Sequence, residues 1–194
     1  MRNDYLNNRQ LINIGFVGGG EVSSIGLAHR IALRMDRRYN LCAGVFSRNH
    51  SKSKHIARKL GIEDDRAYSN FIEMAEREQL RKDGISVVSI MTPPLSHYKI
   101  ASYFLKRKYN IISDKPLVSN IKEANNLKLI AKKNNIPFCV TYNYTGYPLV
   151  REARDLIQKG KIGKVLNVNV EYLQGHLAGL NKNNFKKILK WRSK

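Results

Sequence analysis

The residues of this chain best suited to chemistry are Asp114-Lys115-Pro116, which directly follow a short apolar run. A lysine beside a carboxylate, with its backbone restrained by the next proline, can donate hydrogen bonds to a substrate oxygen and to a cofactor ribose. The same three residues would also suit an ordinary surface turn whose ion pair contributes little. Which reading holds depends on where the fold places the turn.

A second candidate is the run of three glycines from Gly18 to Gly20, which ends an apolar stretch and precedes helical spacing from Ile25. Strand, glycine turn and helix predict a dinucleotide site, because glycines admit a pyrophosphate and a helix N-terminus offers free N–H groups. Ser23 replaces the third glycine of the fingerprint; it is small enough for close packing and can cap the helix. Gly18, Gly20 and Ile25 are therefore cofactor-binding candidates, with a plain turn as the alternative.

Two further strand ends carry polar residues that suit a nucleotide. Ser47-Arg48 follows the apolar run 41–46, at the position that contacts the adenosine ribose in a Rossmann fold. An acidic residue there would select the free 2′-hydroxyl of NAD, whereas a hydroxyl and an arginine suit the 2′-phosphate of NADP. NADP is therefore favoured over NAD. Thr92-Pro93 closes the run 85–91, and His97 begins the next helix. We predict cofactor contacts for all five residues. The alternatives are a solvated loop at Arg48 and a capping histidine at position 97.

The elements that must position these residues alternate regularly. This alternation predicts an α/β fold, a Rossmann doubly wound parallel sheet over residues 1–142, with ligands at the carboxyl ends of the strands. From Asn143 the pattern changes to a helix and one strand, which predicts the start of a second, incomplete α/β domain over 143–194. Strands are expected over 11–17, 41–46, 85–91, 110–113, 137–142 and 164–172, and helices over 25–35, 51–59, 69–82, 97–108, 119–134 and 148–159.

Composition narrows the function classes. With 194 residues and 42% hydrophobic content the chain can bury a core, and it has no apolar run of about 18 residues, so no membrane partner is expected. The net charge of +20 is spread over nearly every helix without a nucleic-acid motif, so we expect loose attraction to polyanions and no specific nucleic-acid partner. Cys42 and Cys139 lie in apolar runs and lack metal spacing, which favours buried thiols in a cytoplasmic protein.

Taken in order, these motifs resemble the Gfo/Idh/MocA family of NAD(P)-dependent oxidoreductases, named after glucose–fructose oxidoreductase and inositol dehydrogenase. The resemblance extends from Asn13 to Trp191. The segments that carry it are Gly18-Gly19-Gly20, Ile25-Gly26 with His29-Arg30, Ala43-Gly44-Val45-Phe46-Ser47, Thr92-Pro93-Pro94 with His97, Asp114-Lys115-Pro116, and Tyr142-Asn143-Tyr144-Thr145-Gly146-Tyr147-Pro148 with Arg151. Among these, Asp114-Lys115-Pro116 resembles the family's Glu-Lys-Pro signature, with Asp114 in place of Glu.

The resemblance implies a Rossmann domain followed by an α/β domain whose open sheet covers the active site and often mediates oligomerisation. It implies hydride transfer between NAD(P) and a hydroxyl or carbonyl carbon of a sugar-like or cyclitol substrate, with a homo-oligomer expected. Lys115 matches the family's motif lysine, which orients and polarises the substrate oxygen and is the one catalytic candidate.

Two departures from the family pattern bear on activity. Val22 stands where the branch this chain resembles usually has another glycine, and the family's catalytic Asp and His have no counterpart here, so the second domain is expected to be truncated. Three hypotheses follow: an oxidoreductase, an inactive remnant that retains only nucleotide binding, and a polyanion binder without nicotinamide affinity.

Overall fold

The computed structural model describes residues 11–173 and 175. The chain divides into two compact units, one up to Tyr144 and one from Thr145, and each is described by itself. No helix of the described residues is long and apolar enough to cross a membrane.

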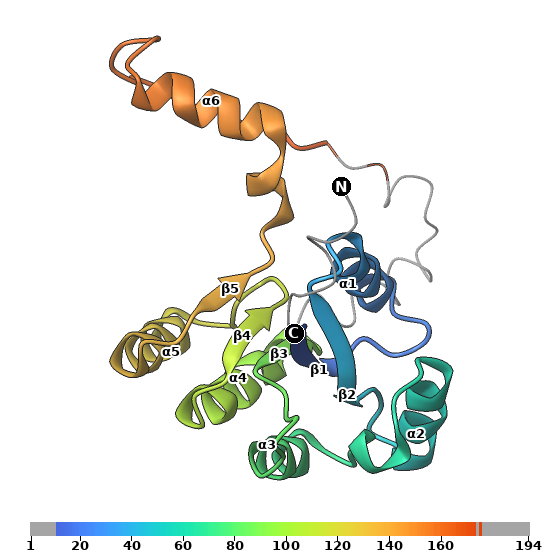
Figure 1. Ribbon diagram of the computed structural model, residues 1–194. Helices are drawn as coiled ribbons and strands as arrows, with labels where there is room; N and C mark the ends of the chain where they lie inside the picture. Colours follow the sequence, from blue (N-terminus) through green and yellow to red (C-terminus); the bar gives the residue numbers. More distant parts are fainter. Residues whose placement is uncertain (1–10, 174, 176–194) are drawn as a thin grey trace, which may run out of the picture. The chain divides into compact units, whose positions relative to one another are not determined.

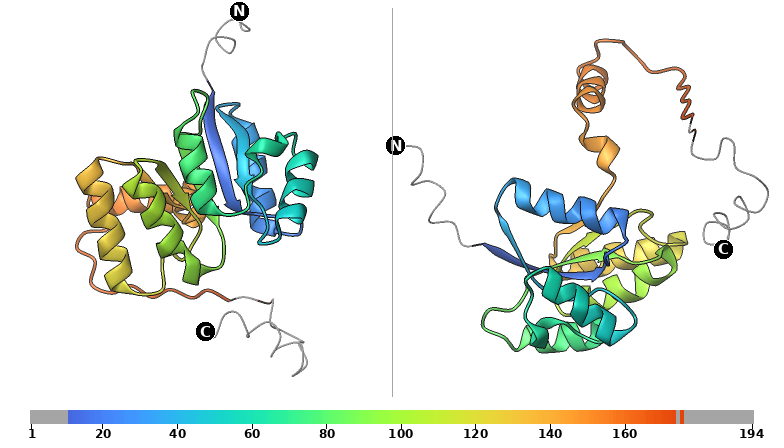
Figure 2. Two further views of the ribbon diagram at one scale, coloured as in Figure 1. Left: turned by 90° about the horizontal axis from the view of Figure 1, so that it is seen from below. Right: turned by 90° about the vertical axis from the view of Figure 1, so that its right-hand side faces the viewer.

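The first unit is built on a five-stranded parallel sheet of order β2-β1-β3-β4-β5, which confirms the predicted α/β class (Figure 1). The helix α1 covers one face of the sheet, and α3, α4 and α5 cover the other (Figure 2). The strands are β1 (Ile12–Gly18), β2 (Tyr39–Val45), β3 (Val87–Met91), β4 (Asn110–Ser113) and β5 (Phe138–Val140). The helices are α1 (Ser24–Met35), α2 (His50–Lys59), α3 (Phe71–Gln79), α4 (His97–Lys106) and α5 (Ile121–Asn134), with 3₁₀ turns η1 (Asp64–Arg66), η2 (Pro94–Ser96) and η3 (Asn143–Gly146).

The core lies on both faces of the sheet, as expected when helices cover both sides of parallel strands. In β1, Ile14 and Phe16 pack toward α1 and α2, whereas Val17 packs toward α3 and α4. All five residues of β3 are buried. β3, which ends at Met91 beside Gly18, is therefore covered on both faces and pairs with β1 on one edge and β4 on the other.

Asparagines cap three of the helices. Asn49, Asn70 and Asn120 cap α2, α3 and α5, and each side chain accepts at least one hydrogen bond from a main-chain N–H of the first turn. The helices expected from Ser51, Ser69 and Ser119 begin at His50, Phe71 and Ile121, each directly after its asparagine. The helix expected over 69–82 ends at Gln79, so α3 is shorter than predicted at both ends.

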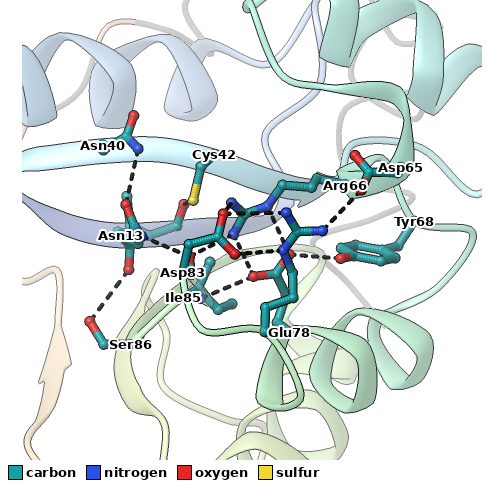
Figure 3. Close-up of polar contacts among 12 residues, drawn as sticks. Asn13, Asn40, Cys42, Asp65, Arg66, Tyr68, Glu78, Asp83, Ile85 and Ser86 are labelled. Carbon is teal, nitrogen blue, oxygen red and sulfur yellow. Dashed lines mark hydrogen bonds and ion pairs between the residues drawn. The ribbon is translucent and has the colours of Figure 1, made fainter.

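A buried ion pair fixes the chain before it enters β3 (Figure 3). The Arg66 guanidinium donates to both Glu78 carboxylate oxygens at 3.0 and 2.6 Å, and their side chains are 6% and 0% exposed. The Tyr68 hydroxyl and the main-chain N–H of Ile85 also donate to Glu78, at 2.7 and 3.0 Å. Because every lone pair of this carboxylate has a donor, its burial is compensated.

The cysteine expectation was half right. Both cysteines are free thiols; Cys42 is partly buried, whereas Cys139 is exposed. Cys139 lies on β5, the last strand of the sheet, which has a neighbour on one side only. A strand at the edge of a sheet is covered less fully than a central one. Cys139 is therefore exposed although the residues around it in β5 are apolar.

In the second unit, the described residues contain the helix α6 (Pro148–Gln158), close to its predicted range. The prediction of a strand over 164–172 is wrong: the sequence there has an apolar pattern, but these residues pair with no strand. Val168 and Val170 are 72% and 79% exposed. A strand needs a hydrogen-bonded neighbour, and the described residues of this unit provide none. The second domain as a whole, 143–194, extends beyond the described residues and stays a prediction.

Candidate functional site

The five strands of the first unit end level with one another. Gly18 pairs with Met91, Ile90 with Ser113, and Ser113 with Val140. The turns that follow these strands therefore lie along one edge of the sheet, which we call the carboxyl edge. Strand order reverses between β1 and β3, and at such a switch point the chain leaves a crevice where ligands bind.

The glycine turn requires glycine at the positions that the sequence singled out. Gly18 has a φ of 92°, a backbone conformation that side chains disfavour. A Cβ on Gly20 would lie 2.7 Å from the carbonyl oxygen of Phe46, too close for any side chain. This turn therefore brings bare backbone to the rim of the crevice, next to the first turn of α1.

Sequence reasoning assigned close packing of the helix to Ser23, but Gly26 performs it. Ser23 caps α1 and accepts from the N–H of Gly26 at 3.1 Å, which confirms the capping half of the prediction. A Cβ on Gly26 would lie 2.4 Å from the carbonyl oxygen of Gly19, so α1 approaches the glycine turn backbone to backbone. The signal was present in the sequence as the glycine after Ile25 within an otherwise helical pattern.

Three side chains of α1 and the preceding turn define the crevice further. The Arg30 guanidinium donates to the carbonyl oxygen of Gly19 at 2.8 Å and so fixes the turn from below. Ile25 is partly buried against the core that contains Ile14, so it has only its main-chain N–H to offer a ligand. The Val22 side chain is 95% exposed and makes no core contact, so it does not fill the space that glycine leaves in the family branch.

His29 lies under the crevice between α1 and β3. Its Nδ1 is 2.9 Å from the hydroxyl of Ser89, which is fully buried. Burial lowers the pKa of His29, and the Asp114 carboxylate opposes this shift. The imidazole is therefore neutral at pH 7, and the floor of the crevice carries no fixed cation from this residue. Neither His29 nor Ser89 was among the predicted site residues.

Ser47 and Arg48 follow β2 on the carboxyl edge. Ser47 is partly buried and its hydroxyl accepts from the N–H of Asn49 at 3.2 Å, which holds the turn before α2. Arg48 is exposed and free of ion pairs among the described residues. Both residues lie at the end of the strand that neighbours β1, as the nucleotide hypothesis requires.

Thr92, Pro93 and His97 follow β3. Thr92 is partly buried and Pro93 is exposed at the rim. The His97 side chain is 1% exposed, and its Nε2 and Nδ1 lie 2.6 and 2.9 Å from the carbonyl oxygens of Thr92 and Pro116. The ring therefore ties the turn after β3 to the turn after β4. This differs from the cofactor-facing position expected of His97, because both of its ring nitrogens are already engaged by main chain.

Asp114 and Lys115 follow β4. The N–H of Asp114 donates to Ile90 at 2.8 Å, and its carboxylate accepts from the Thr141 hydroxyl at 2.8 Å. The aspartate is thus fixed between the ends of β3 and β5. Lys115 is the next residue, exposed at the rim. Asp114 therefore anchors the turn from which the exposed Lys115 side chain extends.

The residues present fit a dinucleotide. A backbone turn that only glycine can form stands at the N-terminus of α1, where main-chain N–H groups have no intrahelical partner and favour a pyrophosphate. The described residues contain no cluster of three or more His, Cys, Asp or Glu that would hold a metal ion. The glycine turn at the β1/β3 switch point therefore suits an anionic organic ligand.

Comparison with known proteins agrees with this geometry. The chain is 35% identical over 177 residues to the "Uncharacterized oxidoreductase YfiI" of Bacillus subtilis, covering 91% of this chain and 45% of that protein. It is 47% identical, with a TM-score of 0.75, to a solved oxidoreductase from Sinorhizobium meliloti, covering 79% of this chain and 43% of that one. An inositol dehydrogenase homolog from Azotobacter vinelandii, solved with NADH and myo-inositol, matches at 35% identity and a TM-score of 0.77, over 80% of this chain and 41% of that one.

The chain spans less than half the length of each of these relatives. Its match to a family description is to the "Oxidoreductase family, NAD-binding Rossmann fold" of the Gfo/Idh/MocA group, over residues 12–142. This range takes in the glycine turn, the Lys115 turn and all five strands. The chain therefore belongs to the Gfo/Idh/MocA family of NAD-binding oxidoreductases.

Proposed function

We propose that this protein is an NAD(P)-dependent oxidoreductase that exchanges a hydride between the cofactor and a hydroxyl or carbonyl carbon of a sugar-like or cyclitol substrate. The observation that supports it most is the placement of the glycine turn and of Lys115 on one edge of the sheet, beside the β1/β3 switch point. The substrate class rests on the Azotobacter vinelandii relative solved with myo-inositol.

In this proposal Gly18 and Gly20 admit the pyrophosphate, and the N–H of Ile25 together with its neighbours in α1 binds it. Thr92 and Pro93 form the opposite wall of the crevice. His97 acts through these turns as a positioning residue. When bound, NAD(P) supplies the group that exchanges the hydride.

Lys115 is the catalytic candidate. Its exposed amine follows a turn fixed by Asp114, and it would donate a hydrogen bond to the substrate oxygen. A fixed cation stabilises the negative charge that develops on that oxygen as hydride leaves or arrives. The same amine, with Asp114 nearby, is placed to contact the cofactor ribose.

We propose NADP ahead of NAD as the cofactor. Ser47 supplies a hydroxyl at the end of β2, and Arg48 supplies a guanidinium that makes no ion pair with the described residues. No carboxylate occupies that turn to bind a free 2′-hydroxyl. The relative crystallised with NADH keeps NAD as the competing choice. Substrate binding and oligomerisation are assigned to the second domain, residues 143–194.

A second candidate function is nucleotide binding without turnover. It requires only the first unit, to which the family match over residues 12–142 is confined. Isothermal titration with NADPH and NADH, followed by a turnover assay with cyclitols and sugars, separates the two functions. Micromolar cofactor affinity with turnover supports the oxidoreductase, and the same affinity without turnover supports the binding module. If neither cofactor binds below about 1 mM, a free energy near −4 kcal/mol, both functions are refuted.

A further inference from the structure

The edge of the sheet opposite the crevice carries an excess of basic residues that the oxidoreductase function does not use. The strands also begin level, since Ile12 pairs with Tyr39, Ile14 with Val87, and Val87 with Asn110. Each helix that leads into β2, β3, β4 or β5 therefore ends on this edge. We call it the amino edge and define it by the segments 34–38, 76–86, 106–109 and 132–137.

These four segments hold eleven Lys and Arg and four Asp and Glu. Three of the cations are paired with carboxylates: Arg77 with Glu73, Arg81 with Asp65 and Asp83, and Arg107 with Glu76. Eight further cations are exposed and make no ion pair with any carboxylate of the described residues. They are Arg34, Arg37, Arg38, Lys82, Lys106, Lys108, Lys132 and Lys133.

Stabilisation of helix dipoles is the simplest reason for basic residues at helix carboxyl ends. Each such end carries about −0.5 of a charge, so four of them account for about two cations. Glu78 is occupied by Arg66, which lies outside the segments. The other three carboxylates of the segments, with the neighbouring Asp65 and Glu73, account for five more cations. Eleven cations exceed this total by about four, so the dipoles and ion pairs leave a positive surplus at the amino edge.

The surplus is arranged for an extended ligand. The segments follow one another across five parallel strands spaced about 4.8 Å apart, so the cations spread over about 20 Å. A single phosphate group would contact only one part of this surface, such as the 280 Å³ pocket lined by Arg81, Lys82, Arg107 and Lys108. A ligand with repeated phosphates would contact several segments at once.

We propose that the amino edge binds the phosphodiester backbone of double-stranded nucleic acid without reading its sequence, separately from the dinucleotide crevice. Tyr109, the aromatic residue of the loops on this edge, is buried, so the edge has no platform on which unpaired bases would stack. A duplex, with its higher charge density, is therefore preferred over a single strand. Exposed apolar residues are few there, Met35 and Leu80, which disfavours insertion into a membrane.

The test compares two variants that lose the same three charges. The edge variant is Lys82→Gln/Lys106→Gln/Lys133→Gln, and the control is Lys52→Gln/Lys99→Gln/Lys122→Gln. All six lysines are exposed. Lys99 and Lys106 lie at opposite ends of α4, and Lys122 and Lys133 at opposite ends of α5. Residues 145–194, which carry further cations, are identical in both proteins.

Binding of a fluorescent 20-base-pair DNA is measured by anisotropy from 50 to 200 mM salt. With about four phosphate contacts the logarithm of the association constant should fall against the logarithm of salt with a slope of about −3.5. The edge variant should reduce this slope to about −1, whereas the control should keep it. A scrambled duplex should bind equally, and NADPH should not displace either one.

Three outcomes would overturn the proposal: no binding at 50 mM salt, equal weakening by the two variants, or tighter binding to phosphatidylserine vesicles than to the duplex at the same salt. Circular dichroism of both variants checks that they are folded. None of these measurements requires cofactor binding, so the result is independent of the oxidoreductase function.

Discussion

Gly26 of α1 packs directly on the main chain of Gly19, so that a Cβ on Gly26 would lie 2.4 Å from the Gly19 carbonyl oxygen and 2.6 Å from its Cα. At this point the helix and the glycine turn therefore touch backbone to backbone. Backbone cannot rotate aside as a side chain does, so even a methyl group at this position must displace α1 or the turn.

Gly26→Ala is accordingly expected to lower the free energy of unfolding by about 1–3 kcal/mol and to weaken NADPH binding at least tenfold. The matched control is Gly146→Ala, because a Cβ on Gly146 meets nothing within 4 Å. Urea unfolding and calorimetry measure the two effects. Unchanged cofactor affinity in a folded Gly26→Ala protein would show that the turn does not hold the pyrophosphate.

The ion pair between Arg66 and Glu78 should contribute far more than exposed pairs of the same type (Figure 3). Glu78→Gln leaves a buried guanidinium without its bidentate partner, and we expect a loss of about 3 kcal/mol, because Asp83 remains at 3.1 Å to share the charge. Asp64→Asn breaks an exposed pair with Arg58 and should change stability far less, because solvent screens this pair. Similar urea midpoints for the two variants would contradict this ranking.

His97 lies between two carbonyl oxygens, which accept hydrogen bonds and cannot donate them. The ring therefore connects the turn after β3 to the turn after β4.

Replacement by His97→Leu keeps the volume but removes both ring nitrogens. Amide hydrogen exchange of segments 92–97 and 114–118 should then rise at least tenfold, and His97→Gln should give an intermediate rise because its amide can replace one of the two contacts. Exchange that stays at the wild-type rate would mean that the ring does not hold these turns together, and this holds whether or not the protein binds a cofactor.

The two thiols should react very differently. Burial raises the pKa of Cys42 to about 11, so at pH 8 about one thiol in a thousand is ionised. Alkylation of Cys42 by iodoacetamide should therefore be slow and rise about tenfold per pH unit between 8 and 10, while the exposed Cys139 serves as the fast internal reference. Peptide mass spectrometry measures both rates. Rapid labelling of Cys42 in the native protein at pH 8 would contradict its burial.

Lys115→Met should lower turnover at least 100-fold with any cyclitol or sugar that the wild type oxidises, because it removes the cation nearest the developing charge. The affinity for NADPH should fall by less than tenfold, since Gly18, Gly20 and the N-terminus of α1 remain. Lys122→Met, an exposed lysine on α5, should leave both quantities unchanged. A Lys115→Met protein with wild-type turnover would remove this residue from the mechanism.

The sequence alone determined which segments become strands and helices in the first unit, and it located the strand ends where ligands bind. Hydrophobic periodicity and glycine turns are properties of a short stretch of chain, so they can be recognised without knowledge of the fold. For example, β4 was predicted at its observed bounds, Asn110–Ser113. It also identified Gly18 and Gly20, whose backbone geometry leaves no room for a side chain.

Only the tertiary structure decided what depends on neighbours distant in the chain. The exposure of Cys139, the engagement of His97 by two carbonyl groups, and the use of Gly26 in place of Ser23 for close packing all depend on contacts between separate elements. The same is true of residues 164–172, whose apolar pattern forms no strand because a strand takes its hydrogen bonds from a partner that the pattern itself does not supply.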